Sequence, residues 1–256
     1  MASRLRDLYV SLSEENIRSA KKQCFVCDSL LAGLDNNEPG NLAYLFVEAL
    51  NDNAPFKEID VPFIPKVRKE GRNKPATILA RASRASKLPE ALNGFTFINK
   101  EIPHLRASSK ARQYAKGWID FIGKKDASKP DYPRPVLGEI KWKSDKNPFY
   151  ALIQLFTYLS EISTPNQISR ICQQDLFRGI KKPETFDLHI FLCEFIDKGI
   201  KSELLNQARI LALTFKEKLG QINPEISKKV GEITCFKSFV NKEQSDFTSI
   251  SIAWTV

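Results

Sequence analysis

Two short runs of alternating apolar and charged residues constrain this chain more than any other feature. The first is Gly-Trp-Ile-Asp-Phe-Ile, residues 117–122, and the second is Leu-Gly-Glu-Ile-Lys-Trp, residues 137–142. Such alternation predicts two β-strands, because successive side chains of a strand point to opposite faces of a sheet. If the strands pair, one face places four apolar side chains together as core: Ile119, Phe121, Ile140 and Trp142.

The opposite face would carry the charged side chains of Asp120, Glu139 and Lys141. Buried charge is costly unless it is paired or bound to metal, so this cluster indicates a functional site. Carboxylates are ligands that Mg2+ and Mn2+ accept, and a bound metal ion activates water and neutralises charge on a phosphate. Lys141 could orient that water, help to deprotonate it or stabilise the transition state. The pattern predicts a phosphodiester hydrolase; the alternative is a surface ladder of salt bridges.

A helix should follow the second strand. Asn147-Pro148 predicts its start, with Asn as the N-cap and Pro at the first helical position. Gln154 and Tyr158 lie four residues apart and would share a face of this helix. Glu139-Ile140-Lys141 is the only Asp/Glu-x-Lys triplet in the chain, so the combination of triplet, strand and helix is more specific than the triplet alone.

These segments resemble the motifs of the PD-(D/E)XK nuclease superfamily, and more narrowly of its RecB-like branch. The matching residues are Gly117-Trp118-Ile119-Asp120, Glu139-Ile140-Lys141 and the helix residues from Gln154 to Tyr158. Ile119 stands where the name-giving Pro often lies. The resemblance implies an α/β fold with a restriction-endonuclease-like core, in which a central mixed β-sheet is flanked by helices.

The resemblance also implies roles for individual residues. Asp120 and Glu139 would bind Mg2+, for which Mn2+ would substitute, and the main-chain carbonyl of Ile140 would add a ligand. Lys141 would assist the nucleophile, and Gln154 and Tyr158 would line the site. In this branch a helix before the sheet often contributes a further acidic residue, for which Glu48 is the candidate; the alternative is an ordinary solvated helix residue.

A basic segment points to a polyanionic partner. Residues 66–87 hold eight Lys and Arg against one acid, and the whole chain has a formal net charge of +9. Cations at this density suit contacts with a phosphate backbone, although they could also form a merely solvated surface. The predicted nucleic-acid-binding residues are Arg68, Lys69, Arg72, Lys74, Arg81, Arg84 and, after the second strand, Lys143.

The other predicted elements suggest a single domain over residues 1–256. A helical extension over 1–35 would precede a core over 41–196, and a C-terminal helix with two additional strands would occupy 197–256. Ser11-x-x-Glu14 reads as a capping box that starts a helix ending near Gly33. Cys24 and Cys27, two of five cysteines, are expected to be packed helical thiols rather than a zinc site.

The chain is expected to be soluble and cytoplasmic, because no apolar run reaches the length of a membrane span and no signal-peptide core is present. DNA is the favoured substrate, with RNA as an open alternative. A second alternative is a nucleic-acid-binding or assembly module without catalysis on the same fold. The choice between exonuclease and endonuclease stays open, as does the formation of a homo-oligomer.

Overall fold

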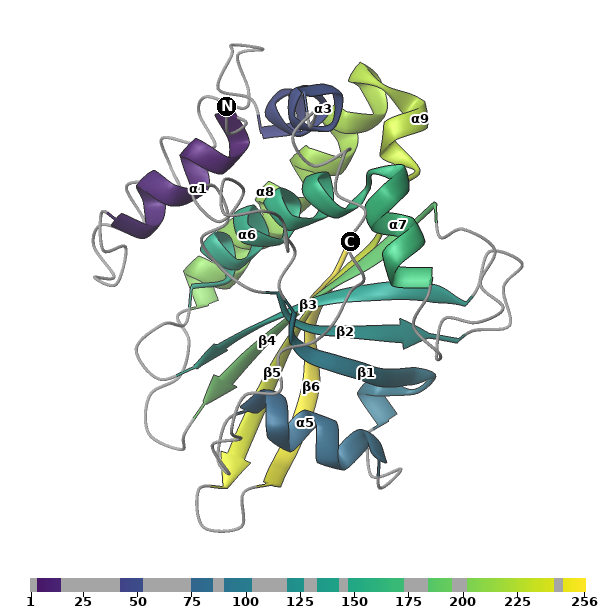
Figure 1. The fold of residues 1–256 in the computed structure, drawn as a ribbon. Helices are drawn as coiled ribbons and strands as arrows, with labels where there is room; N and C mark the ends of the chain where they lie inside the picture. The colour runs from purple at the N-terminus through teal and green to yellow at the C-terminus, as the bar shows by residue number, and fades with distance from the viewer. Residues whose placement is uncertain are drawn as a thin grey trace.

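A six-stranded mixed sheet, with strands in the order β1-β2-β3-β4-β5-β6, organises the computed structural model of the chain (Figure 1). The strands are Phe95–Ile102, Ile119–Lys125, Arg134–Trp142, Phe186–Glu194, Val230–Asn241 and Asp246–Thr255. The structure describes residues 4–14, 42–52, 75–84, 90–102, 119–126, 133–142, 147–172, 184–194, 202–241 and 246–256.

The direction of each strand follows from the connection before it. Strands β1, β2 and β3 form an antiparallel meander, and β5 and β6 form an antiparallel pair. Strand β4 is parallel to both β3 and β5. Parallel neighbours need a crossover, which α6 (Pro148–Ile162) and α7 (Pro165–Cys172) supply before β4, and α8 (Ser202–Ile222) and α9 (Pro224–Ser227) supply before β5.

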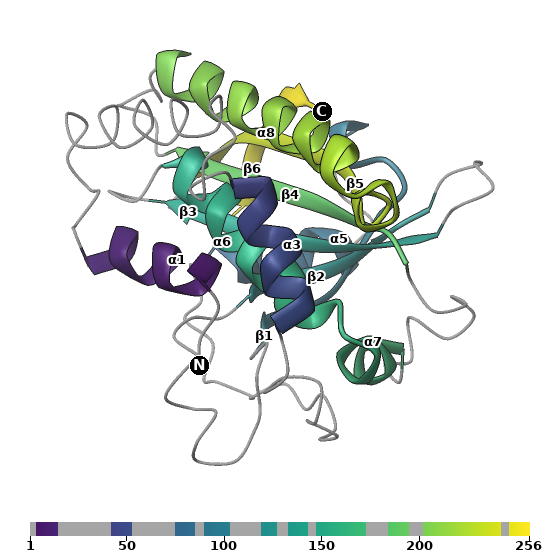
Figure 2. The same ribbon diagram turned by 90° about the horizontal axis from the view of Figure 1, so that it is seen from above.

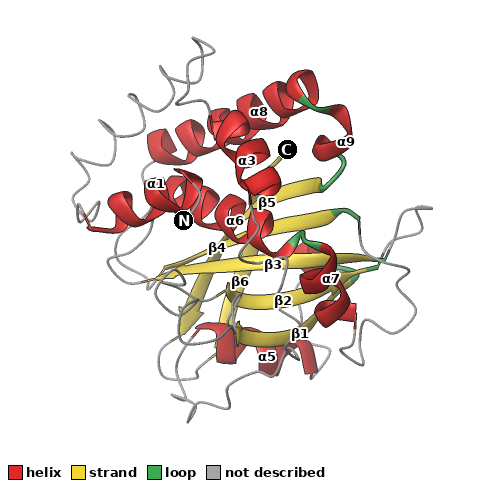
Figure 3. Ribbon diagram, turned by 45° about the horizontal axis from the view of Figure 1, so that its top comes forward, coloured by secondary structure: helices red, strands yellow, loops and turns green. Residues whose placement is uncertain are grey.

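Helices cover both faces of the sheet (Figures 1 and 2). Helix α6 lies on β3 and β4, and it is covered in turn by α1 (Arg4–Glu14), α3 (Leu42–Asp52) and α8. The opposite face carries α5 (Pro75–Arg84) and the short 3-10 helix η1 (Glu90–Leu92), as the red helix beneath the yellow strands shows in Figure 3.

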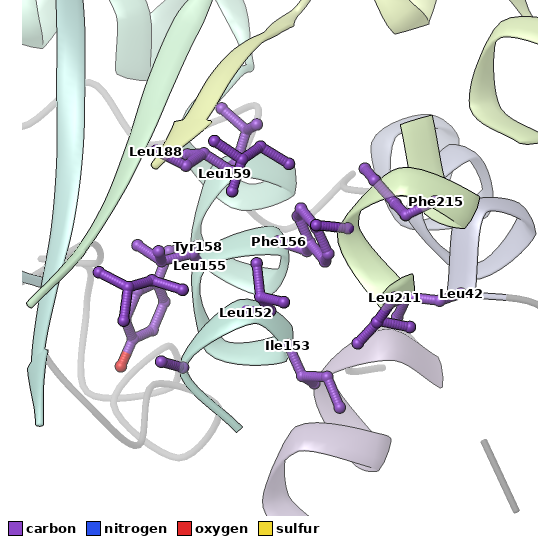
Figure 4. Close-up of a cluster of buried hydrophobic side chains, with 14 of the residues drawn as sticks. Leu42, Leu152, Ile153, Leu155, Phe156, Tyr158, Leu159, Leu188, Leu211 and Phe215 are labelled. Atoms are coloured by element: carbon purple, nitrogen blue, oxygen red, sulfur yellow. The ribbon is translucent and has the colours of Figure 1, made fainter. Parts of the chain in front are cut away.

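Each face has its own apolar core. The α6-side core joins α6 to α3 and α8, and in Figure 4 Phe156 points towards Phe215 of α8 while Tyr158 lies on the other side of α6. The rings of Phe156 and Phe215 stack with centroids 3.8 Å apart. The α5-side core joins the sheet to α5 through residues that include Phe121, Ile140 and Phe191.

Glycine is required at two places in the meander of β1, β2 and β3. Gly94 has a positive φ of 76°, and its carbonyl accepts a 2.7 Å hydrogen bond from the amide of Asp126, which closes the end of the β1–β2 pair. A Cβ at Gly138 would lie 1.8 Å from the ring of Phe121. The absence of a side chain at Gly138 therefore leaves room for the Phe121 ring to pack directly on the β3 backbone, next to Glu139.

Within the described residues, the two predicted strands and the helix that follows them agree with β2, β3 and α6, but the predicted start of the first helix is wrong. Ser11 is not an N-cap: it lies inside α1, where its hydroxyl donates to the carbonyl of Leu8, and residues 15–41 with Cys24 and Cys27 lie outside the described part. Helix α8 includes Gly220 and ends at Ile222, and β2 ends at Lys125. Within the described ranges, no helix has both the length and the apolar character of a membrane span.

Candidate active site

Glu139 and Lys141 lie on the α6 side of β3, as the alternation predicts. Ile140 and Trp142 point to the α5-side core, which turns their two charged neighbours towards α6. The Lys141 ammonium donates to Glu139 Oε1 at 3.0 Å and to Gln154 Oε1 at 2.8 Å. Both charged residues are only 3% exposed. This is a buried, hydrogen-bonded ion pair and not the surface salt-bridge ladder of the alternative interpretation.

Asp120 joins this group from β2. Its Oδ2 accepts a 2.8 Å hydrogen bond from the main-chain amide of Ile140, the residue between Glu139 and Lys141. The ladder between β2 and β3 runs from Phe121–Gly138 to Lys125–Arg134, so the carboxylate bonds to β3 just beyond its paired part.

The predicted packing of Ile119 with Phe121, Ile140 and Trp142 is wrong. Ile119 belongs to the α6-side core and does not pack with Phe121 and Ile140 on the other face. Phe121 does contact the α5-side core as predicted, and Trp142 packs against it. The strict alternation along β2 therefore fails at Asp120, where a side chain takes the amide hydrogen bond of the neighbouring strand.

Helix α6 contributes the next two members of the group. Gln154 accepts from Lys141 through Oε1, and its Nε2 donates to the Tyr158 hydroxyl at 2.9 Å. Asn147 fixes the start of the helix, because its side chain accepts from the amides of Phe149 and Tyr150. Gln154 and Tyr158 are both buried, and Gln154 reaches Lys141 of β3.

Aromatic rings surround Lys141 and Tyr158. The Lys141 nitrogen lies 4.8 Å from the centroid of the Tyr150 ring, a distance typical of a cation–π contact. Tyr9 of α1 stacks on Tyr150 with centroids 5.5 Å apart, and its hydroxyl lies 3.4 Å from that of Tyr158. Arg6 faces the rings of both Tyr9 and Tyr158.

Burial keeps the Tyr158 phenol protonated. The pKa of Tyr158 is raised well above its usual value, first by burial, then by the negative charge of Glu139 and by Tyr9. Because its oxygen accepts from Gln154, the Tyr158 proton can be donated towards Tyr9. Tyr158 therefore acts as a neutral hydrogen-bonding group and not as a phenolate.

The carboxylates of Asp120 and Glu139 are the kind of ligand that a hard cation prefers. Asp120 and Glu139 supply carboxylates on adjacent strands, and Mg2+ commonly binds through one or two carboxylates while it keeps several waters. Within the part of the chain that the structure describes, no three His, Cys, Asp or Glu side chains gather as a metal-holding group. The structure does not bring Glu48 to the other two carboxylates: Glu48 pairs with Arg4 at 3.1 Å, between α3 and α1.

Of the residues predicted to contact phosphate, only Arg81 and Arg84 lie in the described part of the chain. Arg81 is exposed on α5, and Arg84 ends that helix, on the sheet face opposite to Glu139 and Lys141 (Figure 3). The structure therefore does not gather Arg81 with the candidate active site. The other predicted contacts lie outside the described residues: Arg68, Lys69, Arg72, Lys74 and Lys143.

Sequence reasoning missed Arg6, Tyr9, Tyr150 and Glu161. Tyr150 carried a usable signal, because it lies four residues before Gln154 and so shares a helix face with Gln154 and Tyr158. Tyr9 carried none, because it is 149 residues from Tyr158 in sequence. Glu161 reads as a solvated helix residue, yet it is fully buried against Arg6.

Comparison of the chain with family models, with curated proteins and with solved structures gives no match. The function must therefore be argued from the geometry of the candidate active site.

Proposed function

We propose that this protein is a metal-dependent nuclease that hydrolyses phosphodiester bonds, with DNA as the favoured substrate. The observation that carries the proposal is the connected group formed by Glu139, Lys141, Gln154 and Tyr158, with Asp120 bonded to the main chain between Glu139 and Lys141. The element order from α5 to β4 is a helix, the short η1, three strands, the helices α6 and α7, and a strand, which is compatible with a restriction-endonuclease-like core.

The chemistry of the group supports hydrolysis more than a structural role. A charged lysine and two carboxylates on one side of a sheet cost desolvation energy that an apolar core would avoid. The Lys141 ammonium has a carboxylate, an amide oxygen and an aromatic face as neighbours. Each of these interacts more favourably with a cation than with a neutral amine. Lys141 is thus suited to orient the attacking water and to stabilise negative charge on the phosphate in the transition state.

Asp120, Glu139 and the Ile140 carbonyl are the groups that would hold Mg2+ or Mn2+. When bound, the ion would activate water and neutralise charge on the phosphate. Gln154 would hold the Lys141 side chain through its Oε1, and Tyr158 would hold the Gln154 amide. The net charge of +9 favours a polyanionic substrate.

Incubation with linear, circular and single-stranded DNA and with RNA, each with Mg2+, Mn2+ or EDTA, tests the proposal directly. We expect cleavage of DNA that requires the metal ion. Lys141→Ala should abolish cleavage, since it removes the cation, and should leave DNA binding in EDTA nearly unchanged. Lys228→Ala is the matched control, because Lys228 is exposed and, within the described residues, forms an ion pair with the nearby Glu225.

Full activity in Lys141→Ala would exclude this mechanism. DNA binding by the wild-type protein without cleavage in any metal would instead favour the non-catalytic module. Cleavage confined to RNA would retain the chemistry and change the substrate.

A further inference from the structure

Helix α1 reaches the candidate active site through Tyr9. The side chain of Tyr9 is 7% exposed and contacts two tyrosines of α6. Its ring stacks on Tyr150 with an interplanar angle of 18°, and its hydroxyl lies 3.4 Å from the Tyr158 hydroxyl. Tyr150 contacts Lys141 directly, and Tyr158 is linked to Lys141 through Gln154.

These contacts form a closed ring. Starting from Lys141, hydrogen bonds run through Gln154 to Tyr158 and then to Tyr9. The return path runs from Tyr9 by ring stacking to Tyr150, whose face meets the Lys141 ammonium. A long lysine side chain has several rotatable bonds, so support from two sides restricts its position far more than one contact would.

Arg6 anchors Tyr9 from the same helix. Its Nε donates to Glu161 Oε1 at 2.7 Å, and a second bond joins its terminal nitrogen to Glu161 Oε2. The guanidinium lies 5.2 Å from the centroid of the Tyr9 ring and 5.7 Å from that of the Tyr158 ring. A buried two-point contact of this kind fixes α1 against α6 in one orientation.

We propose that Tyr9 is a positioning residue for Lys141: it holds the Tyr150 ring and the Tyr158 hydroxyl so that the ammonium stays aligned with Glu139 and Gln154. The contribution of Tyr9 is divided between two groups. The ring supports Tyr150, and the hydroxyl supports the hydrogen bonds through Tyr158 and Gln154. The inference depends on the proposed nuclease function only where activity is the readout.

The two groups can be separated by substitution. Tyr9→Phe keeps the ring and removes the hydroxyl, so we expect kcat to fall about fivefold, the effect of one neutral hydrogen bond. Tyr9→Leu removes both contacts and should lower kcat about 30-fold or more, with KM changed less than about threefold, because alignment and not binding is lost.

A spectroscopic readout tests the alignment without catalysis. Protons held over an aromatic face resonate upfield, so lysine 13Cε-labelled protein should show a shifted Lys141 methylene signal, assigned by its absence in Lys141→Arg. The shift should persist in Tyr9→Phe, shrink in Tyr9→Leu and be lost in Tyr150→Leu. Leu12→Ala, at another buried position of α1, serves as the packing control and should retain the shift.

An unchanged Lys141 signal in folded Tyr9→Leu would overturn the inference, even if the wild-type protein cuts DNA. An equal loss of kcat in Leu12→Ala would also overturn it, because the effect would then belong to helix packing. If the wild-type protein cuts nothing, the nuclease proposal fails, and the signal in Tyr9→Leu still decides the positioning role.

Discussion

Lys141 shows how a single residue can be both buried and charged. Its hydrogen bonds to Glu139 and Gln154 and the face of Tyr150 replace the water that burial removes. These contacts come from β3 and α6, so the ammonium is placed by two elements that are adjacent in sequence. The charge of Lys141 therefore depends on how α6 packs on β3.

His189 is a second buried titratable residue, and it lies on the other face of the sheet. It packs among Phe95, Phe191 and Phe236, and neither ring nitrogen has a hydrogen-bond partner within the described part of the chain. Burial, reinforced by the charge of Lys125, lowers its pKa to about 3. This environment is that of a packed, neutral histidine and not of a general base.

The lowered pKa of His189 predicts loss of stability in acid. The unfolded chain takes up a proton below its ordinary pKa of 6.5, and the folded protein does not until the pH approaches 3. The stabilisation is therefore complete above pH 6.5 and falls by about 1.4 kcal/mol per pH unit below it. Between about pH 6.5 and 3, urea denaturation should show a steeper loss of stability in the wild-type protein than in His189→Leu, by about this amount per pH unit. Parallel pH profiles for the two proteins would contradict the prediction.

At the level of elements, the sequence predicted the strands and helices around the candidate site well. The charged face of β3 and the N-cap of α6 are encoded by local patterns, alternation and an Asn-Pro pair, which act over a few residues. The wrong predictions arise from long-range contacts. Ile119 departs from the alternation because Asp120 bonds across to Ile140, and α1 begins earlier than its apparent capping box because it packs on α6.

The start of α6 can be tested through its cap. Asn147→Ala leaves the amides of Phe149 and Tyr150 without their side-chain acceptor, so the free energy of unfolding should fall by about 1 kcal/mol. Chemical denaturation would measure the change. Asn223→Ala is the control: Asn223 caps the four-residue helix α9 through one amide, and its removal should cost less. Equal losses would argue against a special role for the α6 cap.

The contact between α1 and α6 depends on a buried ion pair. Burial alone would lower the pKa of Arg6, but the charge and hydrogen bonds of Glu161 outweigh it and raise that pKa. Glu161→Gln leaves the guanidinium buried without its counter-charge, which should cost about 3 kcal/mol of stability. The double variant Arg6→Met/Glu161→Leu should recover most of this loss in urea denaturation. A loss well below 1 kcal/mol in Glu161→Gln would contradict the prediction.

For the molecule as a whole, some of the basic side chains are held by internal contacts. Lys125 pairs with Glu232 at 2.7 Å, and Arg134 pairs with the buried Asp187 at 3.4 Å. Lys216 donates to the carbonyls of Gly231 and Val256 and so joins α8 to the end of the chain. Composition predicts a polyanionic partner, but it does not show which cations serve internal packing.

Metal binding should be measurable as a gain in whole-protein stability. On the proposed function, Mg2+ at about ten times its dissociation constant should raise the free energy of unfolding by about 1.4 kcal/mol, because a site built from Asp120 and Glu139 would exist only in the folded protein. Thermal denaturation with and without Mg2+ checks this. Asp120→Asn/Glu139→Gln should abolish the gain and Glu48→Gln should keep it. If Glu48→Gln instead abolishes the stabilisation by Mg2+, Glu48 would be a metal ligand after all.

Tyr9 also defines how much of the chain a working site requires. A fragment that starts at residue 42 would contain Asp120, Glu139, Lys141, Gln154 and Tyr158, and therefore every residue of the recognisable sequence pattern. It would lack the ring stacked on Tyr150 and the cation paired with Glu161. On the proposed function, the smallest active fragment should therefore be larger than the segment that carries the pattern.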